Sequence, residues 1–186
     1  MNNNTRTNQQ RWQDIKPKLI TALKVVVFAM SVTVIMALGF YYSVLYGAFG
    51  EIPSDDDLRN IQNAVATEVY SSDNVLLGKY YLENRTIVKF IDISPYAVNA
   101  LIATEDARFF SHEGVDTRSL FRVLIKSILL QDDSSGGGST ISQQLIKNLF
   151  PRKNHGMLTI PVNKTREAII AHRLEKVYNK NDVLTL

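Results

Sequence analysis

A long apolar run near the N-terminus is the strongest feature of the hydrophobic pattern. No charged residue occurs between Val25 and Gly50, and almost every position from Val25 to Leu45 is apolar. A helix of this length can cross a bilayer core of about 30 Å. Aromatic residues close the run, as is typical of a membrane interface. They are Tyr41, Tyr42, Tyr46 and Phe49. The pattern predicts one transmembrane helix over residues 25–46.

A cleaved signal peptide is the alternative interpretation of this run. Its apolar region would span about 7–15 residues before a cleavage site, and the longer run here favours an uncleaved anchor. Residues 1–24 form a polar tail with five basic residues and one acidic residue, and residues 1–15 are expected to be disordered. Four acidic residues follow the run within residues 51–57. The positive-inside rule therefore predicts a cytoplasmic N-terminus, with residues 51–186 outside.

Residues 47–92 are expected to form a linker with short β-strands. Two β-prone segments, residues 65–70 and 75–81, flank a turn of Ser, Asp and Asn residues at 71–74, which predicts a hairpin. A third short strand is expected over residues 86–91. A short helix is expected over residues 58–64, after a segment rich in helix-capping residues.

Helical periodicity dominates the remainder of the chain. Ser94 and Pro95 supply an N-cap and a first helical residue, so a helix is expected from there to about Asp106. Asp116 or Thr117 caps the next helix. The other expected segments are helices over 117–130, 141–150 and 162–178, a polar loop over 131–139 and an irregular segment over 151–160. Together these elements predict a mainly α domain over residues 93–186.

Composition and charge exclude several classes of function. The chain has 186 residues and no cysteine, which excludes disulfide scaffolds, cysteine-ligated metals and a catalytic thiol. Three histidines give little support to a histidine-rich metal site. The net charge is +3, but after the basic tail 16 basic residues face 17 acidic ones. The body of the protein is not basic, so the sequence argues against nucleic acid as a partner.

The first polar cluster, residues 105–114, ends an apolar helix. Glu105 and Asp106 are adjacent carboxylates at the negative end of the helix dipole. Partial desolvation there would raise a carboxylate pKa and suit it to proton transfer. The alternative is a solvated helix end with an ion pair to Arg108.

The second cluster, residues 135–148, is a glycine loop that leads into a helix. Free backbone N–H groups at a helix start favour phosphate oxygens, although no lysine follows the last glycine as in a Walker loop. Gln144, Lys147 and Asn148 share one helix face, which suits sugar hydroxyls and a phosphate. The alternative is a flexible linker before a polar helix face.

The third cluster, residues 163–167, lies on the last long helix. Lys164 and Glu167 are three residues apart and therefore neighbours on one face. Ile170, Leu174 and Val177 form the apolar stripe behind them. The alternative is a surface helix with an ordinary ion pair.

In this order, the three clusters resemble the peptidoglycan glycosyltransferase domain of class A penicillin-binding proteins over about residues 60–186. The Glu-Asp-x-x-Phe-x-x-His-x-Gly motif is matched by Glu105, Asp106, Phe109, His112 and Gly114. The Gly-x-Ser-Thr-Ile-Thr-Gln-Gln motif with its Lys-Asn continuation is matched by Gly137, Gly138, Ser139, Thr140, Ile141, Gln143, Gln144, Lys147 and Asn148, with Ser142 for the second Thr. The Arg-Lys-x-x-Glu motif is matched by Lys164 and Glu167, with Asn163 for Arg.

This resemblance implies a mainly α, lysozyme-like fold at the outer face of the cytoplasmic membrane. It implies an enzyme of peptidoglycan synthesis, cell-wall biogenesis and cell shape that polymerises lipid II and releases undecaprenyl pyrophosphate. Glu105 would be the general base, and Glu167 would assist pyrophosphate departure by orienting Lys164 or a divalent ion. Substrate-binding roles fall on Asp106, Phe109, His112, Gly114, Gly138, Ser139, Thr140, Gln143, Gln144, Lys147, Asn148 and Lys164.

The resemblance also implies partners. They are lipid II with the growing glycan chain, the cytoplasmic membrane and other cell-wall synthesis proteins. No cofactor is obligatory, and a divalent cation, Mg²⁺ or Mn²⁺, is the one that the resemblance leaves open.

The family continues past the position of Leu186 with further motifs and a penicillin-binding transpeptidase domain. The sequence is therefore expected to be a truncated glycosyltransferase domain, from a longer product or a truncated gene, with weak or no activity. One alternative function is a non-catalytic membrane protein that binds lipid II or a cell-wall synthase. Another is a muramidase-like hydrolase, against which the glycine loop and the anchor argue.

Overall fold

The computed structural model describes residues 8–61, 67–80, 88–125 and 137–186. The chain divides into two compact units, Met1–Ala48 and Phe49–Leu186. Most of the described residues are helical, with one two-stranded sheet, which confirms the predicted mainly α class.

The first unit is built on one helix, α1 (Asn8–Leu45). Its segment Ile15–Leu45 is long and apolar enough to cross a membrane, by length and composition. The helix begins well before the predicted span, so the expectation of disorder is wrong for residues 8–15. A nucleated helix extends at little cost through Gln and Arg, which have good helix propensity. Residues 1–7 lie outside the described part.

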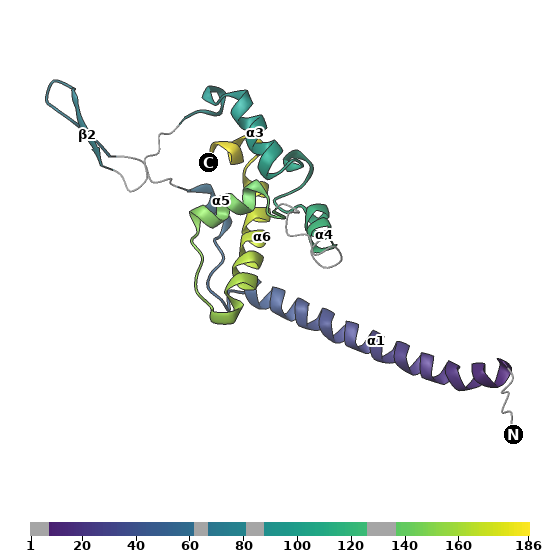
Figure 1. Cartoon of the computed structure of the whole chain (residues 1–186). Helices are drawn as coiled ribbons and strands as arrows, with labels where there is room; N and C mark the ends of the chain where they lie inside the picture. The colour runs from purple at the N-terminus through teal and green to yellow at the C-terminus, as the bar shows by residue number, and fades with distance from the viewer. Residues whose placement is uncertain (1–7, 62–66, 81–87, 126–136) are drawn as a thin grey trace. The chain divides into compact units, whose positions relative to one another are not determined.

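The second unit holds the hairpin and the shorter helices (Figure 1). Its strands are β1 (Thr67–Tyr70) and β2 (Leu76–Tyr80). Its α-helices are α2 (Asp55–Arg59), α3 (Pro95–Glu105), α4 (Thr117–Ile125), α5 (Ile141–Leu149), α6 (Thr159–Val177) and α7 (Lys180–Thr185). Short 3-10 turns occur at η1 (Phe90–Asp92), η2 (Phe109–Ser111) and η4 (Gly156–Leu158).

The predicted hairpin is confirmed in its described residues. β1 and β2 pair antiparallel, with Thr67 opposite Tyr80, and a bulge lies between Val69 and Tyr70. The third strand is wrong where it can be compared: residues 88 and 89 are not in a strand, and the 3-10 turn η1 begins at Phe90. β-propensity needs a partner strand to become a ladder, and here the chain turns toward α3. Residues 86 and 87 lie outside the described part.

The predicted capping residues stand at the starts of α3 and α4, but of these two only α4 has a side-chain capping bond. Asp116 accepts a hydrogen bond from the Ser119 N–H at 3.1 Å, so Asp116 rather than Thr117 caps α4. Ser94 precedes Pro95 at the start of α3, but its side chain makes no capping bond. α2 ends at Arg59, before the expected end, and residues 62–64 lie outside the described part. Four other expected boundaries also lie outside the described residues. They are the hairpin ends at 65 and 81, the end of the helix after Asp116 at 130 and the start of the glycine loop at 131.

The last long helix starts earlier than expected. α6 begins at Thr159, within the segment expected to be irregular, and carries Pro161 in its first turn. Proline is tolerated there because the first N–H groups of a helix have no partner within the helix.

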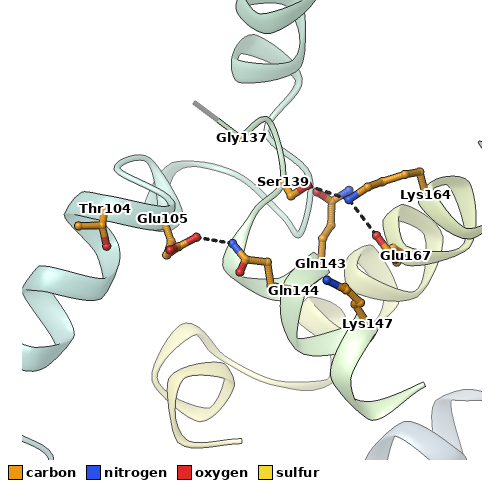
Figure 2. Close-up of a pocket in the computed structure, with 9 residues that line it drawn as sticks. All are labelled: Thr104, Glu105, Gly137, Ser139, Gln143, Gln144, Lys147, Lys164 and Glu167. Carbon is orange, nitrogen blue, oxygen red and sulfur yellow. Dashed lines mark hydrogen bonds and ion pairs between the residues drawn. The ribbon is translucent and has the colours of Figure 1, made fainter. Parts of the chain in front are cut away.

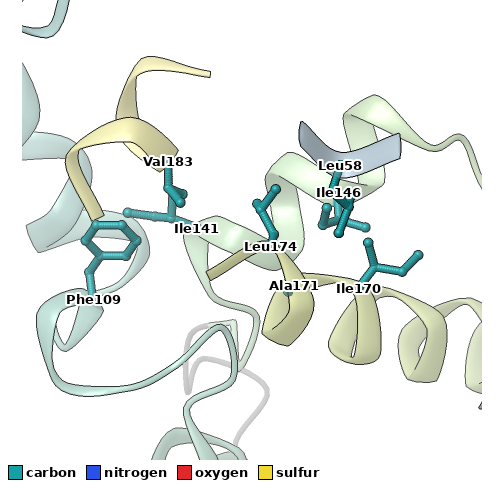
Figure 3. Packing of buried hydrophobic residues seen from close by; sticks show 8 residues of the cluster. All are labelled: Leu58, Phe109, Ile141, Ile146, Ile170, Ala171, Leu174 and Val183. Carbon is teal, nitrogen blue, oxygen red and sulfur yellow. The ribbon is translucent and has the colours of Figure 1, made fainter. Parts of the chain in front are cut away.

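One hydrophobic cluster forms the core of the second unit (Figure 3). α5 and α6 pack against each other, and α2 packs against α6. The predicted apolar stripe of α6 is confirmed for Ile170 and Leu174, which are fully buried. The buried members are Leu58, Phe109, Ile141, Ile146, Ile170, Ala171, Leu174 and Val183.

A half-buried ion pair joins α7 to this core. Lys180 Nζ lies 2.5 Å from Glu175 Oε2 and 4.3 Å from the centre of the Phe109 ring. The other Glu175 oxygen accepts a hydrogen bond from Ser142 on α5. The residue that replaces the family's threonine, Ser142, therefore supports the packing of three segments.

A glycine of the first polar cluster brings that cluster onto α6. Gly114 has a φ of +80°, in the left-handed region. A Cβ atom there would lie 2.6 Å from the backbone carbonyl of Ala171, much closer than any side chain allows. The Gly114 carbonyl also accepts a 2.6 Å hydrogen bond from the Thr140 hydroxyl, which links it to the start of α5.

We predict that Gly114→Ala destabilises the second unit by about 2–5 kcal/mol, because backbone strain and overpacking add. Thermal unfolding of the detergent-solubilised chain measures the effect. Gly78→Ala is the matched control, since a Cβ at Gly78 meets nothing within 4 Å. Equal unfolding midpoints for the two variants would show that the close approach to α6 is not required.

Candidate active site

Side chains from all three polar clusters meet around an open pocket of roughly 250 Å³ (Figure 2). Half of the fourteen residues predicted to form the site lie in its wall. The lining residues are Thr104, Glu105, Gly137, Ser139, Gln143, Gln144, Lys147, Lys164 and Glu167. A second pocket of roughly 200 Å³ shares part of this wall and adds Asp106, Gly138 and Thr140. The tertiary structure thus brings together segments up to about 60 residues apart.

Glu105 stands at the end of α3 on one side of the first pocket. Its Oε2 atom accepts a 2.7 Å hydrogen bond from Gln144 Nε2 on α5. The side chain is exposed, so the expected partial desolvation is wrong. The reason is that α3 buries none of its residues, so the Glu105 side chain at its last position stays accessible to solvent.

The neighbouring carboxylate, Asp106, is buried and fully engaged. Both of its oxygens lie within 3.1 Å of His112 Nε2, and its Oδ2 accepts a 3.2 Å bond from the Ile141 N–H. Because α3 ends between the two carboxylates, they face different surroundings. Asp106 fixes the end of α3 to the start of α5.

Four residues predicted to bind substrate line neither pocket: Phe109, His112, Gly114 and Asn148. Phe109 is fully buried in the core, and His112 faces Asp106. Gly114 packs on α6, while Asn148 is exposed on α5. The first three make structural contacts, with the core, with Asp106 and with α6 and Thr140 respectively.

The start of α5 is occupied by the protein's own groups. The Thr140 N–H bonds Gln143 Oε1 at 3.0 Å, the Ile141 N–H bonds Asp106, and the Gln143 N–H bonds the Thr140 hydroxyl at 3.2 Å. This capping box corrects the expectation that these amides are available to a phosphate. Positive charge for an anion must come from side chains instead.

Lysines supply that charge. Lys164 Nζ donates to Ser139 Oγ at 2.9 Å and pairs with Glu167 Oε2 at 3.1 Å, as Figure 2 shows. Lys147 extends from α5 into the same pocket. The wall opposite Glu105 is therefore cationic.

Glu167 is held by two cationic side chains. Arg152, in the segment between α5 and α6, donates from Nε to Oε1 at 2.7 Å and from a terminal nitrogen to Oε2 at 3.2 Å. Burial alone would raise the pKa of Glu167, but the hydrogen bonds and charges of Arg152 and Lys164 outweigh it and lower that pKa. Glu167 is therefore an anion near neutral pH, suited to orienting Lys164 rather than to transferring protons.

Sequence reasoning missed Arg152. It lies in a segment expected to be irregular and belongs to none of the three motifs. The absence of the motif arginine at position 163 could have indicated it. A buried carboxylate at Glu167 requires a cation besides Lys164, and that cation must then come from elsewhere in the chain.

The described residues do not fit a divalent cation at this site. Both oxygens of Glu167 already bind Arg152 and Lys164. Across the described ranges, no group of three His, Asp or Glu side chains is placed to hold a metal ion.

Comparison with known proteins extends these observations. The chain is 31% identical to penicillin-binding protein 1A of Escherichia coli over 153 residues, which are 82% of this chain and 17% of that protein. It is 35% identical to penicillin-binding protein 1A of Pseudomonas aeruginosa over 138 residues, 73% of this chain and 16% of that protein. It is 32% identical to penicillin-binding protein 1F of Bacillus subtilis over 160 residues, 86% and 21% respectively.

The chain thus spans about a fifth or less of these relatives' length. A sequence model of the transglycosylase family matches residues 73–186, a range that contains all three motifs and every residue of both pockets. The matched range is more than half of the chain, and its predicted lysozyme-like class is that of the family. With its three polar clusters assembled around one pocket, the chain belongs to the transglycosylase family.

Proposed function

We propose that the pocket between α3, α5 and α6 is the active site of a peptidoglycan glycosyltransferase that polymerises lipid II. One observation carries the proposal: an exposed carboxylate, Glu105, faces a wall that holds Lys147 and Lys164. The carboxylate can accept the proton that a sugar hydroxyl must lose. The ammonium groups can stabilise the negative charge of a leaving pyrophosphate.

Glu105 acts as the general base. It takes the proton from the 4-hydroxyl of the acceptor sugar, and that oxygen attacks the anomeric carbon of the growing chain. The bond from this carbon to undecaprenyl pyrophosphate breaks, and the configuration inverts. The hydrogen bond from Gln144 supports this role, because it fixes one carboxylate oxygen and so limits rotation of the side chain.

The leaving pyrophosphate is stabilised on the cationic wall. Charge-assisted hydrogen bonds from Lys164 and Lys147 suit phosphate oxygens, which gain charge as the glycosidic bond breaks. Lys164 Nζ contacts Ser139 on one side and Glu167 on the other. The ammonium group is therefore positioned before substrate binds.

A membrane anchor suits such a substrate. The polyprenyl tail of lipid II stays in the bilayer, and α1 carries a segment that is long and apolar enough to span it. We place the N-terminus in the cytoplasm and the second unit on the outer face, because basic residues precede the apolar segment and acidic residues follow it. Other cell-wall synthesis proteins are proposed partners on that face.

The direct test of this function is Glu105→Gln in the native protein purified from membranes. We expect lipid II polymerisation to fall about 10²–10⁴-fold, because the general base is lost, while binding of lipid II remains. Gel analysis of glycan strands measures the product.

Glu113→Gln is the matched control, since Glu113 belongs to the same cluster but lines neither pocket. Wild-type polymerisation by the Glu105 variant would refute the base assignment. A wild-type protein that binds lipid II without extending it would instead favour a binding module, and shortened glycans would indicate a hydrolase.

The lowered pKa of Glu167 predicts how stability depends on pH. A carboxyl with a lowered pKa stabilises the folded state above its ordinary pKa of about 4.3, and this contribution is lost as pH falls through the lowered value. Wild type should therefore exceed Glu167→Gln in unfolding free energy above about pH 5, with the gap narrowing at lower pH. Urea unfolding at a series of pH values measures the gap, and a gap that is constant with pH would contradict the lowered pKa.

A further inference from the structure

The position of the missing motif arginine is taken by Asn163, which has a different function in the structure. Its side chain is buried and faces the segment between α5 and α6. Its amide nitrogen donates to the carbonyls of Lys153 at 2.8 Å and of Thr159 at 2.7 Å, and its oxygen accepts from the Lys153 N–H at 3.2 Å. Asn163 therefore fixes the backbone of that segment to α6.

The residue next to the fixed backbone is Arg152. Its guanidinium group spans both oxygens of Glu167, which is only 5% exposed. This planar, two-bond contact is the geometry in which arginine differs from lysine. Asn163, at the motif position, thus fixes the backbone beside Arg152, and Arg152 contacts the motif glutamate, Glu167.

The contact between Arg152 and Glu167 affects the net charge at the pocket. Glu167 carries one negative charge, and Arg152 and Lys164 each carry a positive one. Arg152 lines neither pocket, whereas Lys164 lies in the pocket wall. Arg152 neutralises the Glu167 carboxylate from outside the pocket. The positive charge of Lys164, which faces the pocket, is therefore not cancelled by Glu167.

We propose that Arg152, held by Asn163, replaces the arginine that the third motif lacks, and that it acts through Glu167 to keep the charge of Lys164 available for the pyrophosphate group. Arg152 is a positioning residue, since its contact is with Glu167 and not with the pocket. This inference rests on the proposed function, in which a pyrophosphate occupies the site next to Lys164.

The test compares binding of inorganic pyrophosphate, by calorimetry on the detergent-solubilised chain, with polymerisation of lipid II by the native protein. Arg152→Met should weaken pyrophosphate binding and lower kcat by about 10–100-fold, as for other residues that orient a ligand-binding group. Arg152→Lys should recover only part of the loss, because it keeps the charge but not the two-bond contact. Lys153→Met is the matched control, and it should behave as wild type because Asn163 contacts only the backbone of Lys153.

Double variants separate positioning from general stability. In a Glu167→Gln background, Arg152→Met should weaken pyrophosphate binding no further, because the group through which it acts is already neutral. Asn163→Ala should reproduce the Arg152→Met defect, and the two together should be no worse than either alone. Additive losses would overturn the proposal, as would unchanged pyrophosphate binding in Arg152→Met.

The two readouts also distinguish this inference from the proposed function. If the wild-type protein does not polymerise lipid II but Arg152→Met still weakens pyrophosphate binding, the proposed function fails and the role of Arg152 stands. If wild type polymerises lipid II and Arg152→Met matches Lys153→Met in both assays, only the role of Arg152 fails.

Discussion

The side chain of Asp106 is buried where α3 ends, and both of its oxygens have hydrogen-bond partners there. His112 supplies one partner through Nε2, and the N–H of Ile141, the first residue of α5, donates a second hydrogen bond. The end of α3 is thereby attached to the start of a helix 35 residues later. Gln144 lies on the first turn of that helix and reaches Glu105. The geometry on the Glu105 side of the pocket depends on this buried carboxylate.

The three carboxylates of the site have different tasks because their surroundings differ. Glu105 is exposed and faces the pocket, which leaves it accessible to a substrate hydroxyl. Asp106, its neighbour in sequence, joins two helices. Glu167 is buried against two cations that lower its pKa, so it serves as a fixed negative charge. The residue type alone does not separate an exposed carboxylate from a structural hydrogen-bond acceptor or a fixed negative charge; burial and hydrogen-bond partners do.

Capping explains why lysines, and not backbone amides, form the cationic wall. A helix start is an anion site only while its N–H groups lack partners within the protein. At α5 the Thr140–Gln143 capping box and Asp106 take three of these groups. Lys164 and Lys147 are left to carry the charge, and this division of tasks makes the environment of Lys164 decisive for the site.

The sequence by itself determined the membrane-length helix, the hairpin, most helix positions and the three motifs, because these depend on local periodicity, capping residues and residue order. It did not determine the exposure of Glu105, the hydrogen-bonded backbone amides around Thr140 or the contact between Arg152 and Glu167. Each of these depends on which distant segment packs nearby, and sequence spacing contains no such information. Arg152 and Glu167 lie 15 residues apart and meet where α5 and α6 pack together, with Asn163 hydrogen-bonded to the segment between these helices.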